Sequence, residues 1–291
     1  MNAKILVLGA TGTVGGETAR ALVRQNVAFA VGVREPERAR QTLSDLSLSH
    51  VELRRFDFAD ATTFGAFAEV ERVFLLRPPS VVNIERDVFP IIQAMKSAGV
   101  RHVVFLSLLG ADKARWMPHA KIEKLLIESG MKWTFLRASY FLQNFSTTHR
   151  DDIKLRDEIF VPAGRGKTSF IDALDIGEVA ALCLTHSEHE NRAYDLTGEL
   201  ALNYYELARD FSEVLGRRIV YQSPSVFGFW RALRKRHIAA PFVLVMIGIY
   251  TTARWGMASR VAPDVRRLLG RAATTPRQFI ERNRALWENR S

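Results

Sequence analysis

Short apolar runs alternate with amphipathic stretches over roughly the first 140 residues of the chain. The apolar residues of runs such as Lys4-Ile-Leu-Val-Leu8 are continuous, which is typical of parallel strands buried on both faces. We predict strands at 4–8, 29–33, 51–56, 73–76, 102–107 and 132–136, and helices at 14–25, 84–98 and 118–129. Because strands and helices alternate, the sequence predicts an α/β fold with a doubly wound parallel sheet.

The pattern changes after about Tyr140, where shorter strands mix with helices. We expect strands at 169–171 and 193–196, helices at 175–185 and 204–215, and a mostly helical chain beyond Ser223 that is broken at Pro241, Pro263 and Pro276. The change predicts a first domain over residues 1–150 and a smaller, mostly helical lobe over 151–291. Segment 169–200 is expected to contribute strands back to the first sheet.

Composition and charge narrow the class of protein. The chain has 291 residues, 47% of them hydrophobic, which is enough for a large core. Its most apolar run, 239–250, is shorter than the roughly 20 residues that span a bilayer, so no transmembrane segment is expected. The role of segment 239–256 stays open between a buried helix, a pocket wall and a peripheral membrane contact.

The net charge of +10 is of a kind that attracts nucleic acid, anionic lipid or anionic ligands. We find no zinc-finger spacing and no clear recognition helix, so no nucleic-acid partner is expected. The one cysteine, Cys183, excludes an internal disulfide and a cysteine-based zinc site. No metal-spaced histidine pair stands out, so no metal is expected, and the cysteine usage fits a reducing cytoplasm.

A glycine-rich turn follows the first predicted strand directly and opens the first helix. It reads Gly9-Ala-Thr-Gly12-Thr-Val-Gly15. A chain that bends sharply between strand and helix, and lets a diphosphate approach its N–H groups, needs glycines at this spacing. In this context the turn predicts a Rossmann-type dinucleotide site, with Thr11, Thr13 and Val14 contributing to it.

The end of the second predicted strand bears on which dinucleotide binds. NAD-binding proteins usually place Asp or Glu there to hold the ribose hydroxyls. This chain has Arg34, whose guanidinium can hold a 2′-phosphate, and Arg38 adds a second positive charge. We therefore predict NADP(H), while Glu35 leaves open a contact with the ribose hydroxyl itself.

Further cofactor contacts are expected where other predicted strands end, because ligands of doubly wound sheets bind outside the carboxyl ends of the strands. Asp57 is a candidate acceptor for the adenine amino group. The expected contacts are Asp57, Phe58, Leu76, Arg77, Pro78, Ser107 and Leu108.

The sequence resembles the NmrA-like family of atypical short-chain dehydrogenases/reductases. The resemblance rests on the glycine turn and on Val73-Phe-Leu-Leu-Arg-Pro-Pro79, and continues in Leu136-Arg-Ala-Ser-Tyr-Phe-Leu-Gln-Asn144 and Phe170-Ile-Asp-Ala-Leu-Asp-Ile-Gly-Glu-Val-Ala180. It implies a Rossmann domain with a small C-terminal substrate lobe. The family includes NADPH-dependent quinone, azo-dye and imine reductases, and also non-catalytic redox-sensing regulators.

The helix after the fifth predicted strand departs from the usual short-chain dehydrogenase pattern. It carries His119 and Glu123 in place of Tyr-x-x-x-Lys. Residues four apart share a helix face, so we expect Glu123 to raise the pKa of His119 and make it a proton donor. A histidine that only packs or caps is the equal alternative. Tyr140 is a further candidate catalytic residue, and Tyr140, Phe141 and Asn144 are candidate substrate contacts.

These observations favour an NADPH-dependent oxidoreductase that passes hydride to a conjugated or aromatic acceptor such as a quinone, enone, imine or azo compound. Such acceptors do not need a tyrosine to stabilise an alkoxide. The alternative is a non-catalytic NADP(H)-sensing protein that binds a protein partner. The expected ligand is a small hydrophobic or aromatic molecule, and a homodimer stays open.

Overall fold

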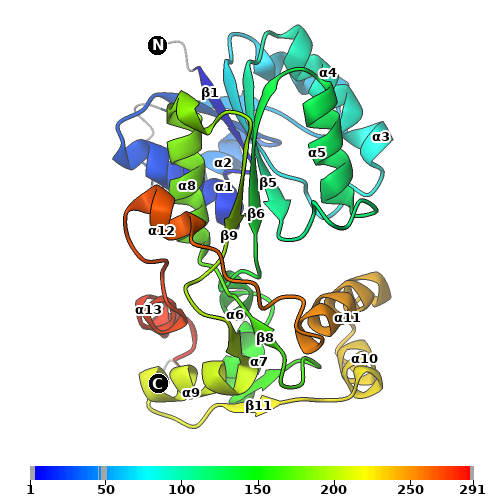
Figure 1. The fold of residues 1–291 in the computed structure, drawn as a ribbon, viewed down its shortest axis with the longest axis vertical. Coiled ribbons are helices and arrows are strands. Elements are labelled where there is room, and N and C mark those ends of the chain that lie inside the picture. Colours follow the sequence, from blue (N-terminus) through cyan, green and yellow to red (C-terminus); the bar gives the residue numbers. More distant parts are fainter. Residues whose placement is uncertain (1–3, 45, 47–50, 289–291) are drawn as a thin grey trace. The chain divides into compact units, whose positions relative to one another are not determined.

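The computed structural model describes residues 4–44, 46 and 51–288, and these form two compact units (Figure 1). Unit 1 is the described chain up to Ala138 together with Ala173–Leu196. Unit 2 is Ser139–Asp172 together with the described chain from Thr197 onward. The division therefore differs from the expected boundary at residue 150, because the chain leaves the first sheet at Ala138 and returns to it with residues 173–196.

The sheet of unit 1 contains seven parallel strands among the described residues, in the order β3-β2-β1-β4-β5-β6-β9. The strand order reverses between β1 and β4, which makes this the doubly wound sheet that the sequence predicted. The strands are β1 (Ile5–Leu8), β2 (Phe29–Val33), β3 (Val51–Arg55), β4 (Arg72–Leu75), β5 (His102–Leu108), β6 (Lys132–Ala138) and β9 (Arg192–Leu196).

Helices cover both faces of this sheet (Figure 1). They are α1 (Thr13–Arg24), α2 (Pro36–Thr42), α3 (Ile84–Asp87), α4 (Phe89–Ser97), α5 (Pro118–Glu128) and α8 (Ala173–Thr185), with 3-10 turns at Ala61–Phe67 and Ser187–His189. α8 packs against α1 so closely that a Cβ on Gly177 would lie 2.5 Å from the carbonyl carbon of Glu17. α1 and α8 therefore cover one face of the sheet as a closely packed pair (Figure 1).

Two predicted elements of the sequence differ in the structure. The helix expected over 84–98 is divided into α3 and α4 at Val88, since Pro90 lacks an N–H group and disfavours a continuous helix before it. The strand expected at 169–171 is reduced to one isolated bridge between Phe141 and Ile171.

Unit 2 combines two small sheets with helices. β7 (Glu158–Phe160) pairs in parallel with β11 (Val220–Gln222), and β8 (Lys167–Thr168) pairs antiparallel with β10 (Leu202–Asn203). The helices are α6 (Gln143–Ser146), α7 (Arg150–Arg156), α9 (Tyr204–Leu215), α10 (Val226–Lys235), α11 (Ala240–Arg254), α12 (Asp264–Leu269) and α13 (Pro276–Arg282), followed by a 3-10 turn at Arg284–Leu286.

The prolines expected as breaks stand at the starts of helices. Pro241 and Pro276 occupy the first turns of α11 and α13, and Pro263 directly precedes α12. This is the helix position where a missing N–H costs least.

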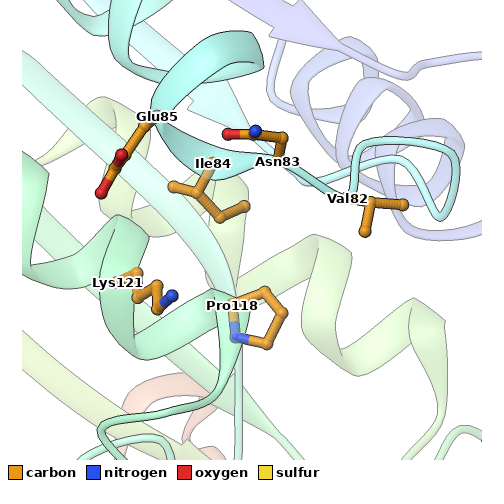
Figure 2. Close-up of a pocket in the computed structure, with 6 residues that line it drawn as sticks. All are labelled: Val82, Asn83, Ile84, Glu85, Pro118 and Lys121. Carbon is orange, nitrogen blue, oxygen red and sulfur yellow. The ribbon is translucent and has the colours of Figure 1, made fainter.

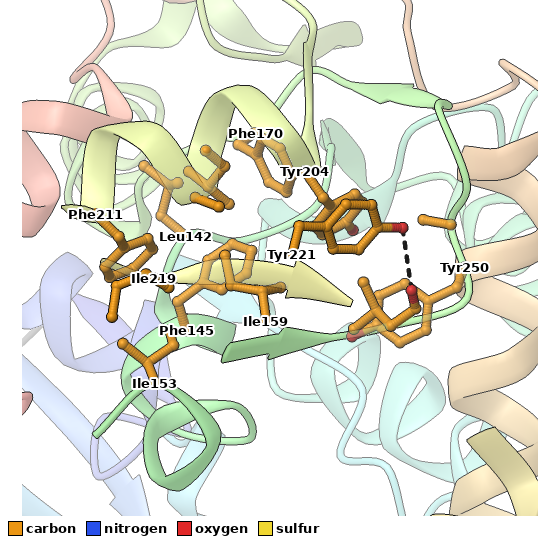
Figure 3. Packing of buried hydrophobic residues seen from close by; sticks show 14 of the residues in the cluster. Leu142, Phe145, Ile153, Ile159, Phe170, Tyr204, Phe211, Ile219, Tyr221 and Tyr250 are labelled. Atoms are coloured by element: carbon orange, nitrogen blue, oxygen red, sulfur yellow. Dashed lines mark hydrogen bonds between the residues drawn. The ribbon is translucent and has the colours of Figure 1, made fainter. Parts of the chain in front are cut away.

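Aromatic rings fill the core of unit 2 (Figure 3). Phe145 lies at its centre, with the rings of Phe170 and Phe211 at centroid distances of 5.6 and 5.8 Å. Trp287 joins this core near the end of the described chain and donates its indole N–H to the Phe145 carbonyl at 3.1 Å. No helix among the described residues is long and apolar enough to cross a membrane.

Candidate functional site

The glycine turn between β1 and α1 is built by close backbone contacts. Gly9 has a left-handed φ of +70°, and a Cβ there would lie 2.7 Å from the Leu76 side chain. A Cβ on Gly15 would lie 2.3 Å from the Gly9 carbonyl oxygen. The Gly12 N–H donates to that same oxygen at 2.9 Å. Any other residue at position 9 or 15 would therefore strain the turn, through the backbone conformation at Gly9 and through backbone contact at Gly15.

The N-terminus of α1 is open for an anion. Gly12 is the N-cap residue, no side chain of the described residues caps the helix, and its first turn holds no acidic residue. Thr11, Gly12 and Thr13 are exposed, while Val14 is buried against the sheet. The free N–H groups and the positive end of the helix dipole suit a pyrophosphate, so this turn fits the dinucleotide that the sequence predicted.

The predicted 2′-phosphate residues follow β2. Parallel pairing sets Gly32 opposite Leu8, so the chain after Val33 runs beside the glycine turn. Arg34 is exposed there, and Arg38 is exposed in the first half of α2. Two exposed cations in this position can approach a phosphate without first breaking a buried contact.

The residues after β4 lie directly against the turn. The Leu76 side chain occupies the space that a Cβ on Gly9 would need. The Arg77 guanidinium donates to the Val81 carbonyl at 2.6 Å, which braces the loop from Pro78 to Val81. Its Nε is buried and has no hydrogen-bond partner among the described residues, and burial lowers the pKa of Arg77. A buried, unused donor beside the turn suits a polar ligand.

Asp57 and Phe58 follow β3. One carboxylate oxygen of Asp57 accepts the Ala59 N–H at 3.0 Å, which shapes a short turn. Phe58 packs edge-on against Phe56 at 5.2 Å between ring centroids. Both residues stay partly exposed, so the adenine contact remains a prediction.

Ser107 and Glu123 form a buried polar cluster with Arg137. The Ser107 hydroxyl donates to Glu123 at 2.6 Å, and the Arg137 guanidinium donates to both Glu123 oxygens at 3.1 and 2.7 Å. The expectation that Glu123 supports His119 is therefore wrong, because its carboxylate is turned toward β5 and β6. Leu108 ends β5, and its carbonyl accepts the Ala111 N–H at 3.0 Å.

His119 is the second residue of α5 and stacks on Phe105 at 6.0 Å between ring centroids. Burial and the positive charge of Arg77 lower its pKa to about 4, the opposite of the expected direction. The ring is therefore neutral near pH 7 and holds no imidazolium proton to donate. Its Nδ1 is buried and has no hydrogen-bond partner among the described residues.

A pocket of about 400 Å³ opens beside the start of α5 in unit 1 (Figure 2). Its lining residues come from the segment that begins α3 and from the first turn of α5. They are Val82, Asn83, Ile84, Glu85, Pro118 and Lys121. Pro118 precedes His119, so the pocket borders the helix turn that holds the unsatisfied imidazole nitrogen.

Tyr140, Phe141 and Asn144 belong to unit 2, whereas His119 belongs to unit 1. The Tyr140 hydroxyl hydrogen-bonds to the Tyr250 hydroxyl at 2.7 Å and to the Asn144 side chain. The Tyr250 hydroxyl in turn bonds to Nε2 of buried His149. Burial raises the pKa of both tyrosines, so both carry their protons at neutral pH.

The sequence reasoning missed Tyr250 and His149, which stand about a hundred residues apart. Tyr250 lies inside the apolar run of α11, where a tyrosine gives no local signal of a polar partner. Arg137 was missed as well, although β5 and β6 pair Ser107 directly opposite Arg137. Strand register was the available signal for that contact.

Comparison with known proteins supports the dinucleotide fold. A model of the NmrA-like family matches residues 1–242. An NAD(P)H azoreductase of Xenophilus azovorans is 32% identical over 97% of this chain and 98% of its own length. An NADPH-dependent quinone oxidoreductase of Escherichia coli, solved with NADPH, matches with a TM-score of 0.86 and 25% identity over 96% of this chain and 99% of its own.

A second solved relative leads to the same assignment. The triphenylmethane reductase of Citrobacter sp., complexed with NADP(H), matches with a TM-score of 0.83 and 26% identity over 96% of this chain and 99% of its own. The family model covers most of the chain, and the azoreductase matches nearly all of it. The chain therefore belongs to the NmrA-like family, as its motifs predicted.

Proposed function

We propose that the protein is an NADPH-dependent reductase that passes hydride to a conjugated or aromatic acceptor of the quinone, enone, imine or azo type. The observation that carries the proposal is the glycine turn, with its open helix N-terminus and Arg34 beside it. The relatives agree with the enzyme class, since they include an NAD(P)H azoreductase and a quinone oxidoreductase solved with NADPH.

Unit 1 supplies the cofactor contacts in this proposal. Residues 9–15 hold the pyrophosphate, Arg34 and Arg38 hold the 2′-phosphate, and Asp57 with Phe58 borders the adenine. The bound cofactor supplies the hydride. The remaining contacts are assigned to the ends of β4 and β5, at Leu76, Arg77, Pro78 and Leu108. Ser107 is left out of this set, because it is fully buried and its hydroxyl donates to Glu123.

Neutral His119 has a defined part in this scheme. Its ring stacks on Phe105, and its buried Nδ1 has no hydrogen-bond partner among the described residues. Its lowered pKa keeps the ring neutral near pH 7, so the ring can form hydrogen bonds but holds no imidazolium proton to give up. This suits acceptors whose reduction needs no protonated imidazole beside them, and it agrees with the missing Tyr-x-x-x-Lys pair.

Unit 2 supplies the acceptor contacts in this proposal. Tyr140 offers a protonated hydroxyl that Tyr250 and Asn144 hold in place. Phe141 offers apolar surface. Tyr140→Phe, which removes only this hydroxyl, therefore lowers turnover of the acceptor without changing NADPH affinity.

The direct test is oxidation of NADPH by purified protein against a panel of quinones, enones, imines and azo dyes. We expect at least one class to be reduced, and Tyr140→Phe to reduce kcat for it. If NADPH binds and no acceptor in the panel is reduced, the reductase proposal is wrong. The relatives do not favour the alternative of a non-catalytic sensor.

We also make proposals about the cellular location and the oligomeric state of the protein. The single cysteine is a buried free thiol, which suits a reducing cytoplasm. A homodimer stays a prediction, and light scattering of the purified protein tests it.

A further inference from the structure

Exposed apolar side chains gather on α10, on α11 and on the segment that follows α11. Nine of the sixteen large hydrophobic side chains that are exposed in the described residues lie there. They are Val226, Phe227, Phe242, Leu244, Val245, Ile249, Trp255, Met257 and Val261. We call them the α10–α11 surface; α10 and α11 pack against each other and lie side by side in Figure 1.

α11 has apolar residues on two sides, one buried and one exposed, which lie about 100° apart around the helix axis. Val243, Met246 and Tyr250 are buried and join the core of unit 2. Phe242, Val245 and Ile249 follow the same helical spacing but are 49%, 58% and 42% exposed. A helix on the surface of a globular protein normally turns polar residues outward. The outward side of α11 is therefore built to meet an apolar surface outside unit 2.

The charge of this region is of one sign. Between Val214 and Pro263 the sequence contains no Asp or Glu, and it contains the basic residues Arg217, Arg218, Arg231, Arg234, Lys235, Arg236, Arg254 and Arg260. Arg217 and Arg236 pair with acidic residues from elsewhere in unit 2. Arg231 and Lys235 are exposed on α10, next to the apolar side chains.

The combination of apolar and basic groups identifies the partner. A second copy of the chain would bring a like-charged surface against this one, and a nucleic acid would leave the apolar side chains unused. An anionic bilayer takes both, since apolar groups enter the acyl boundary and cations meet the headgroup phosphates. Trp255, which is 72% exposed, is the residue type that favours the headgroup level.

We propose that the α10–α11 surface docks unit 2 onto anionic lipid bilayers as a peripheral contact in the plane of the membrane. The proposal goes beyond the reductase activity and needs no cofactor. α11 has 15 residues and is too short to cross the bilayer, so it lies along the interface.

The test is sedimentation of the full chain with sucrose-loaded vesicles. One set contains phosphatidylglycerol with phosphatidylcholine, and the other contains phosphatidylcholine alone. We expect at least tenfold stronger partitioning onto the anionic set, a difference of about 1.4 kcal/mol or more, because the surface carries more than one exposed basic residue. Added salt should release a large part of the bound protein.

Two pairs of variants separate this contact from general stickiness. Phe242→Ser with Val245→Ser should lower partitioning roughly tenfold, whereas Leu155→Ser with Leu200→Ser should not, although these residues of unit 2 are 64% and 70% exposed. Arg231→Glu with Lys235→Glu should abolish the preference for anionic lipid. Lys96→Glu with Lys132→Glu, at exposed positions of unit 1, should leave the preference for anionic lipid unchanged.

Circular dichroism and thermal unfolding establish that each variant is folded. Equal partitioning onto both lipid sets, or an equal loss in the control variants, would overturn the proposal. The proposal also fails if wild type does not bind vesicles and is a dimer in light scattering, while Phe242→Ser with Val245→Ser is a monomer. The surface would then bind a second copy of the chain. Binding to duplex DNA without binding to vesicles would overturn it as well. The proposal is also wrong if Phe242→Ser with Val245→Ser loses NADPH oxidation with a water-soluble acceptor while its vesicle binding is unchanged. The surface would then serve the reaction and not a membrane.

Discussion

Gly15→Ala tests whether backbone contact within the turn makes the cofactor site. A Cβ at this position would lie 2.3 Å from the oxygen and 2.5 Å from the carbon of the Gly9 carbonyl, and 3.0 Å from the Ala10 nitrogen. All three are backbone atoms, so no side-chain rotation relieves the contact. The turn would have to open by about 1 Å to restore ordinary packing, and overpacking of this kind costs about 1–3 kcal/mol.

Gly12→Ala is the matched control. Its Cβ would meet only the Gly9 oxygen, at 3.3 Å, and the φ of −103° suits any residue. The turn can accept this methyl group with a shift of a few tenths of an ångström. Gly12 is exposed at the helix N-terminus, however, so its methyl group would stand where a pyrophosphate approaches.

The two variants therefore differ in stability but not in cofactor binding. In thermal unfolding without ligand, Gly15→Ala should lower Tm by about 3–10 °C and Gly12→Ala by much less. Both should lose most of the rise in Tm that NADPH gives to wild type, because ligand stabilisation depends on affinity. If Gly15→Ala unfolds like wild type and keeps its NADPH response, the turn is not built by this contact.

Three further predictions concern charge and burial. In fluorescence titration, Arg34→Glu should weaken NADPH binding about tenfold to a hundredfold and reduce the preference for NADPH over NADH, while Tm without ligand stays unchanged. An NADPH affinity equal to that of wild type would contradict the phosphate contact. Arg137→Leu should lower the free energy of unfolding by about 3–5 kcal/mol in urea, because it leaves Glu123 buried without its cation, and a loss below 1 kcal/mol would show that the pair is dispensable. The free energy of unfolding should fall as pH drops from 6.5 to 4, by up to about 1.4 kcal/mol per pH unit for each buried histidine. The reason is that these histidines bind protons in the unfolded chain over this range but stay neutral in the folded chain. A Tm that does not change over this range would refute the prediction. The histidines whose pKa burial lowers to about 4 are His102, His119 and His149.

The parts of the fold that could be predicted depend on neighbours in sequence. The glycine turn and the parallel strands have local patterns, because a buried strand is apolar over its own length and a turn needs glycine at its own positions. The division near residue 88 could also have been read from Pro90. These features need no knowledge of distant contacts.

The chemistry around His119 could not be predicted in the same way. Helical spacing placed Glu123 near it, but Ser107 and Arg137 on neighbouring strands bind that carboxylate instead. A full charge pair with Arg137 outweighs a weak contact with an imidazole on the same helix. The pKa of His119 depends on residues that the fold brings near it, and residue spacing within one helix does not reveal those residues.

The last strand of the unit 1 sheet has a consequence for synthesis of the protein. β9 pairs with β6, yet all of residues 139–172 and α8 come between them in the chain. On the ribosome, β6 emerges a few seconds before β9, at about 5–20 residues per second. During that delay the edge of β6 is unpaired and open to other strands. We expect nascent chains that stall before Leu196 to be the aggregation-prone species, and chaperone binding to be concentrated there.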